Sequence, residues 1–133
     1  MSIWTHVSGI IRIDDYKMFG LSGQKTDLSK VFIRNTWFHR NENGNLPTGS
    51  EGSIDVEFID RHEDDSTDYM RTVAFFGDLR DYEDLSLIQS WWRNIPNILP
   101  ESCGIRQAVL LAECETGQRL ILTEKEMDIK KDE

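Results

Sequence analysis

The sequence predicts one α+β domain with a ferredoxin-like split βαβ fold, in which two helices cover one face of an antiparallel sheet. Three observations lead to this prediction. Several short segments alternate apolar and polar residues, as strands with one buried face do. Two other segments repeat apolar residues at helical spacing, and the expected elements follow one another as strand, helix, strand, strand, helix, strand, strand. Right-handed crossovers then place the strands in the order 2-3-1-4-5.

The first expected strand covers residues 3–13, where every second residue is apolar or small. Its other face is mixed and carries Trp4, His6 and Arg12. Such a mixture is typical of an antiparallel sheet whose second side stays accessible. We therefore regard Trp4 and His6 as candidate interaction residues.

Residues 26–38 are predicted to form the first helix, because apolar side chains recur at helical spacing behind Asp27, which can cap the first turn. A strand is the alternative, since Val31 and Ile33 have strand propensity. Residues 39–53 are rich in Asn, Gly, Ser and Pro and are expected to form a long loop. A loop of this length is uncommon within a domain and is either functional or mobile.

Residues 54–59 alternate again, and Asp55 and Glu57 mark the outer face of this strand. Eight acidic residues and one arginine lie between positions 51 and 68. We expect this acidic segment to attract a positively charged partner. Asp55 and Glu57 are accordingly candidate interaction residues, with solubility alone as the other reason for their charge.

Residues 70–76 combine β-branched and aromatic side chains and form the next expected strand. The second helix follows, with an apolar stripe of Leu85, Ile88, Trp92 and Ile95. Pro96 is expected to end it. Trp91 lies about 100° from Trp92 around a helix, so the two cannot enter the same core. Trp91 is then either packed against the first helix or exposed as part of a protein interface.

Two further strands, residues 104–114 and 118–124, flank a turn at Thr116 and Gly117 and predict a terminal hairpin. Residues 125–133 form a charged segment that is expected to fray as a tail. The folded domain is therefore predicted to span residues 1–124.

The chain has 133 residues and a formal net charge of -9, from 15 basic and 24 acidic side chains. Acidity without a basic stripe argues against nucleic-acid binding, because phosphate contacts need Lys and Arg. No apolar run is long enough to cross a bilayer, and no signal peptide follows Met1. Cys103 and Cys114 are predicted to be free thiols in a reducing, cytoplasmic setting, with a bridge between them as the alternative.

The sequence contains no motif for catalysis, for a metal or for a cofactor. The three histidines stand apart from one another and from the cysteines, so none belongs to the close pair that a zinc site requires. A small enzyme or ligand-binding domain is nevertheless the alternative function. It would use Glu57 together with the carboxylates near the second helix, Asp78, Asp81 and Asp84.

Three stretches, WTHVSGIIRID, LPTGSEGS and FGDLRDY, resemble pieces of small uncharacterised proteins of tailed phages and prophages. The resemblance implies expression in the cytoplasm of an infected bacterium, and it assigns no activity and no site residue. We therefore predict a non-enzymatic, acidic interaction module that binds a basic surface of a host protein, without nucleic acid, membrane or cofactor. The sequence leaves the oligomeric state open, including a homodimer.

Overall fold

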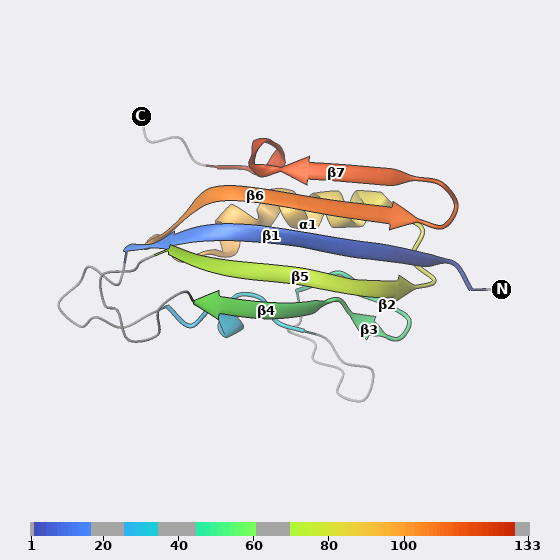
Figure 1. The fold of residues 1–133 in the computed structure, drawn as a ribbon, viewed down its shortest axis with the longest axis horizontal. Helices are drawn as coiled ribbons and strands as arrows, with labels where there is room; N and C mark the ends of the chain where they lie inside the picture. The colour runs from blue at the N-terminus through green and yellow to red at the C-terminus, as the bar shows by residue number, and fades with distance from the viewer. Residues whose placement is uncertain (1, 17–25, 35–44, 61–69, 130–133) are drawn as a thin grey trace.

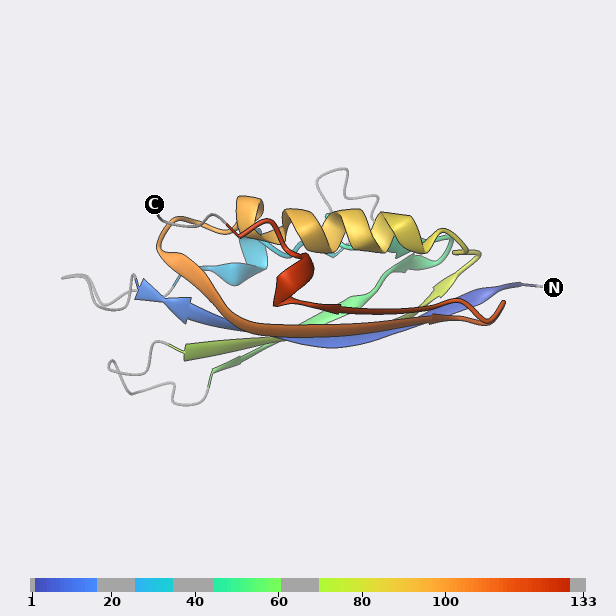
Figure 2. The ribbon, with the colours of Figure 1, turned by 90° about the horizontal axis from the view of Figure 1, so that it is seen from above.

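A five-stranded antiparallel sheet forms the middle of the protein, and helix α1 lies across one of its faces (Figure 1, Figure 2). The structure, a computed structural model, describes residues 2–16, 26–34, 45–60 and 70–129. Across the sheet the strands are β4 (Asp55–Asp60), β5 (Met70–Arg80), β1 (Trp4–Asp15), β6 (Cys103–Cys114) and β7 (Arg119–Thr123). The other elements are α1 (Leu85–Ile98), the 3-10 turns η2 (Leu28–Lys30) and η3 (Glu124–Glu126), and a hairpin of β2 (Thr48–Gly49) and β3 (Gly52–Ser53).

β1 is the central strand, and its alternating pattern sets the two faces of the sheet. It pairs antiparallel with both β5 and β6. Val7, Ile11 and Ile13 belong to the buried core, as the alternation predicts. Gly9 shares their face, and a Cβ atom there would lie 2.6 Å from both the Leu110 side chain and the Val109 carbonyl oxygen. A larger residue at position 9 would therefore disturb the pairing of β1 with β6.

Helix α1 buries the predicted stripe of Leu85, Ile88, Trp92 and Ile95. Asp84 caps its first turn, because the Asp84 carboxylate accepts a hydrogen bond from the Ser86 amide at 3.0 Å. The helix continues past Pro96 to Ile98, so the prediction that Pro96 ends it is wrong. Pro96 removes one amide donor and crowds the carbonyl four residues earlier, but the Leu99 amide still donates to the Ile95 carbonyl at 3.2 Å.

The predicted ferredoxin-like fold with two helices on one face is wrong. The five strands lie in the predicted order, but residues 26–34 contain only the short turn η2 where the sequence predicts the first helix. The rest of that expected helix, residues 35–38, lies outside the described residues. The described part of the chain is an antiparallel sheet with one α-helix and a small second sheet.

Side-chain hydrogen bonds explain why the segment after Asp27 forms one turn and no helix. The Asp27 carboxylate accepts a hydrogen bond from the Ser29 amide at 3.1 Å and caps η2. The Asn45 side chain then accepts from the Ile33 amide at 3.0 Å and donates to the Val31 carbonyl. These bonds use backbone groups that a helix would need. The β-branched Val31 and Ile33 also favour an extended chain.

Two segments that were expected to be loose contact the core in their described parts. Leu46, within the expected loop 39–53, is buried. In the expected tail 125–133, Met127 is buried and the Asp128 amide donates to the Arg93 carbonyl at 3.0 Å. Buried apolar side chains and backbone hydrogen bonds therefore hold the described part of each segment to the domain.

A buried ion pair joins the end of β1 to the start of β5. The Asp15 carboxylate is fully buried and lies 3.3 Å from the Arg71 guanidinium, whose side chain is 8% exposed. Asp15 also accepts hydrogen bonds from the Thr26 amide at 2.8 Å and from the Thr26 hydroxyl at 3.0 Å. Arg71 donates in turn to the Thr26 carbonyl. These contacts compensate the cost of burying both charges and fasten the chain before η2 to the sheet.

Candidate functional site

We call the face of the sheet turned away from α1 the open face (Figure 2). It carries large apolar side chains. Those with exposed fractions between 41% and 60% are Ile10, Ile59, Phe76, Val109 and Ile121. None of the elements that the structure describes lies over this face. A contiguous apolar surface left in water is typical of an interaction site.

Strand register brings these side chains together, because opposite residues of paired strands point to the same face. Ile10 lies opposite Ala74 on β5 and Val109 on β6. The neighbouring row, centred on Ser8, adds residues of β5, β6 and β7. The apolar centre of the open face consists of Ile10, Ala74, Phe76, Val109, Leu111 and Ile121.

Charged residues surround the apolar centre unevenly. At the start of β1, His6 lies opposite Asp78 on β5 and Glu113 on β6. We call the carboxylates at this end the acidic row, made of Asp78, Glu113 and the nearby Glu115. At the other end of β1, Arg12 makes no ion pair with any described residue. Glu57, on the edge strand β4, adds a negative charge beside the row of Ile10. An apolar centre within a polar rim is the usual anatomy of a protein interface.

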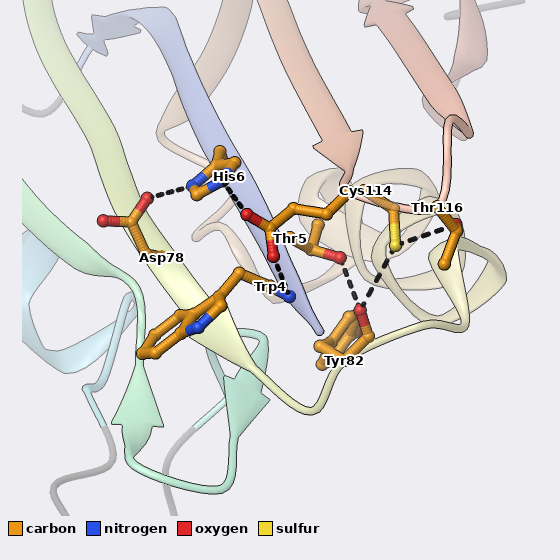
Figure 3. A network of polar contacts seen from close by, with 8 residues as sticks. Trp4, Thr5, His6, Asp78, Tyr82, Cys114 and Thr116 are labelled. Atoms are coloured by element: carbon orange, nitrogen blue, oxygen red, sulfur yellow. Dashed lines mark hydrogen bonds and ion pairs between the residues drawn. The ribbon is translucent and has the colours of Figure 1, made fainter. Parts of the chain in front are cut away.

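His6 is held between two carboxylates from different parts of the chain (Figure 3). Its Nδ1 lies 2.6 Å from Asp78 Oδ1, and its Nε2 lies 3.6 Å from Glu115 Oε2. The Glu115 carboxylate also accepts a hydrogen bond from the Trp4 amide at 3.0 Å. The hydrogen bond with Asp78 raises the pKa of His6 above its ordinary value of 6.5, and Glu115 adds to this effect. His6 therefore links β1, β5 and the turn after β6.

We expect NMR titration to give His6 a pKa above 6.5, and Asp78→Asn to lower that pKa. Because the pKa is raised in the folded protein, the stabilisation from protonated His6 is present below pH 6.5 and is lost as the pH rises through the folded-state pKa. Asp81→Asn is the control, since Asp81 bonds to the Ser50 hydroxyl. A wild-type pKa at or below 6.5, or equal shifts in both variants, would contradict the assignment of Asp78 as the main partner.

A buried polar network lies behind β1, at the start of α1 (Figure 3). The Thr5 hydroxyl donates to the Tyr82 carbonyl, and the Cys114 thiol lies 3.9 Å from the same oxygen. A hydrogen bond from the Thr116 hydroxyl, at 3.1 Å, lowers the pKa of Cys114, whereas desolvation raises the pKa of Tyr82 to about 12. Cys114 is buried, so this network stabilises the turn and presents no accessible nucleophile. Cys103 and Cys114 are free thiols, as predicted.

The structure brings four of the predicted interaction residues to the open face. Trp4 and His6 project from β1, and Asp55 and Glu57 from β4. Asp55 forms an exposed ion pair with Arg34, with 2.7 Å between the guanidinium and the carboxylate. These polar residues form the rim, and the apolar centre lies between them.

Trp91 lies on the other side of the sheet. It is half-buried on α1, and its ring packs edge-to-face on Phe75 with ring centroids 5.3 Å apart. Its Nε1 atom is buried and has no hydrogen-bond partner among the described residues. Trp91 therefore does not contribute to the open face. The remainder of the predicted acidic segment, residues 61–68, lies outside the described residues.

The alternative carboxylate site does not assemble. Glu57 lies opposite Ala74, and Asp78 is four residues further along β5, a separation of about 13 Å. Asp81 binds the Ser50 hydroxyl at 2.9 Å in the turn after β5. Among the residues that the structure describes, no group of three or more potential metal ligands comes together. The described geometry thus gives the enzymatic alternative no support.

Alternation alone does not predict the apolar centre of the open face. The signal that could have found it is a pair of adjacent apolar residues within a strand, because neighbours in a strand point to opposite faces. Ile10 with Ile11, Phe75 with Phe76, and residues 109–111 are such cases. In a sheet covered on one side, each of them leaves an apolar side chain on the other side.

No protein-family model, curated protein or solved structure matches this chain. The resemblance to small proteins of tailed phages remains a prediction. Across the described ranges, no helix has both the length and the apolar character needed to cross a membrane.

Proposed function

We propose that this protein is a non-enzymatic interaction module that binds a partner protein through the open face. The observation that carries the proposal is the set of large apolar side chains, 41% to 60% exposed, gathered on one face of the sheet. Each Å² of apolar surface removed from water contributes about 25 cal/mol, so a partner that covers this face gains free energy. The core on the other face is complete without these side chains.

The rim indicates the chemistry of the partner. The acidic row and Glu57 give the open face an excess of negative charge, in keeping with the net charge of -9. Opposite charges across an interface steer association and fix orientation more than they add affinity. The partner that fits therefore presents an apolar patch with a Lys or Arg placed to meet the acidic row.

The polar groups near the open face support binding more than catalysis. Each ring nitrogen of His6 has a carboxylate oxygen nearby, so His6 has no hydroxyl or thiol to activate among these contacts. The free thiols of Cys103 and Cys114 support the cytoplasmic setting that belongs to this proposal.

Photocrosslinking tests the proposal. A photoreactive amino acid replaces Val109 on the open face, which is 48% exposed, or Leu87 on α1, which is 56% exposed. In cells that naturally contain the protein, we expect irradiation to give protein adducts from position 109 and only background from position 87. Equal yields from the two positions would contradict the proposal, because both side chains are apolar and comparably exposed.

A further inference from the structure

The charge layout of the open face fits a second copy of this chain. This inference rests on the proposed function, that the open face binds a protein, and it names the partner. We propose that two copies associate through their open faces about a two-fold axis that lies between the sheets and runs across the strands. The axis passes between Ser8 and Ile10, so β1 of one copy lies antiparallel on β1 of the other.

Under this symmetry the apolar centres meet. Ile10 faces Ser8 of the second copy, because the two residues lie at equal distances on either side of the axis. On β6, the residues opposite Ile10 and Ser8 are Val109 and Leu111, so these two face each other across the interface. On β5, Ala74 and Phe76 lie opposite Ile10 and Ser8, so these two also face each other across the interface. The two sheets then pack with their mean strand directions within about 30°, as in an aligned β-sandwich.

The same operation places Arg12 over the acidic row. Arg12 of each copy faces the row of His6, between Asp78 and Glu113 of the second copy. Glu113 also pairs with Arg119 of its own chain, at 3.4 Å, and can bind both arginines. Within one chain, Arg12 and His6 are six residues apart on β1, or about 20 Å. Only a second molecule can therefore bring Arg12 to the acidic row.

Two contacts oppose the association, and one of them is between Arg12 and the protonatable His6 of the second copy. In the other, the edge strand β4 lies over β4 of the second copy, where Glu57 faces Asp55. Twisted sheets diverge at their edges, which separates these carboxylates without removing the repulsion. A second copy therefore predicts that removal of the Glu57 charge tightens association. An unrelated basic partner predicts that the same change weakens binding.

The contact is small, so we expect a weak dimer. The contact region covers the seven residues from His6 to Arg12, about 24 Å along β1 with both end residues included. It extends about 19 Å across the four strands β5, β1, β6 and β7, which gives about 450 Å² per copy. The ends of β1 and β6 curl toward the side of α1, which confines the contact to this region (Figure 2). A total of about 900 Å² lies below the range of stable complexes, as in transient associations. A dissociation constant of about 0.1 mM is the corresponding expectation.

Sedimentation equilibrium and NMR dilution of the purified full chain test this inference. We expect concentration-dependent shifts at Ile10 and Val109 and none at Leu87. Arg12→Glu and Glu113→Arg should each weaken self-association roughly tenfold, whereas Glu57→Gln should tighten it about twofold. A mixture of isotope-labelled Arg12→Glu with unlabelled Glu113→Arg should associate within about threefold of the wild type, because both contacts again join opposite charges.

Several outcomes would overturn the inference. A wild-type monomer at concentrations up to about 1 mM is one of them. Another is a dimer whose two charge variants, Arg12→Glu and Glu113→Arg, still associate weakly when they are mixed. A third is a dimer whose association Glu57→Gln weakens. The crosslinking experiment separates this failure from failure of the proposed function. If the protein is a monomer but position 109 crosslinks to a different protein, the open face is still a binding surface, and a second copy is not its partner. A monomer that gives no adducts overturns both.

Discussion

Replacing Trp92 with alanine should lower the free energy of unfolding by about 3 to 5 kcal/mol, the usual cost of truncating a fully buried tryptophan. The Trp92 side chain is 0% exposed and belongs to the buried core. Its Nε1 donates a hydrogen bond to the Thr123 carbonyl at 2.9 Å, which links α1 to β7. The substitution therefore opens a cavity and also leaves a carbonyl without this partner. Urea or guanidinium unfolding measures the loss.

Leu87→Ala is the matched control for Trp92→Ala. Leu87 lies on the same helix but is 56% exposed, so its truncation should change stability by no more than about 0.5 kcal/mol. Similar losses in the two variants would show that α1 packs on the sheet through a different face.

Asp15→Ala should also cost about 3 to 5 kcal/mol, because it removes one member of a buried ion pair, the carboxylate that lies 3.3 Å from the Arg71 guanidinium. The Asp15 side chain is 0% exposed, and that of Arg71 is 8% exposed. The variant also removes the acceptor for the amide and the hydroxyl of Thr26. Denaturant unfolding at neutral pH measures the effect.

Asp55→Ala separates burial from ion pairing as the cause of that loss. Asp55 pairs with Arg34 at 2.7 Å, and both of these side chains are about half exposed. This distance is shorter than the 3.3 Å of the buried pair. Exposed pairs contribute 0 to about 1 kcal/mol. We therefore expect Asp55→Ala to be nearly neutral, and a loss as large as that of Asp15→Ala would refute this difference.

The five strands of the main sheet follow from the sequence because alternation and strand propensity depend on local geometry, and their order follows from the rule of right-handed crossovers. The stripe on α1 is predictable for the same reason, with its own period of 3.6. The segment after Asp27 differs because Asn45, a distant residue in the chain, takes the backbone groups of Val31 and Ile33. A pattern within the segment contains no information about that contact.

The rim of the open face was predictable and its centre was not. Polar residues at alternate positions, such as His6 and Glu57, mark an outer face directly. Ile10 and Val109 resemble core residues in the sequence, because apolar character alone does not tell which side of a sheet receives a helix. No described element covers the face turned away from α1, and this leaves the two side chains exposed.

The most direct test of the open face as a protein-binding surface is a photocrosslinking scan across the sheet. The photoreactive residue is placed in turn at Ile10 and Val109 in the centre, at Ile59 on the edge strand, and at Leu87 on α1. We predict the highest adduct yield at Ile10 and Val109, a lower yield at Ile59, and background at Leu87. Uniform yields, or the highest yield at Leu87, would contradict a binding surface centred on the open face.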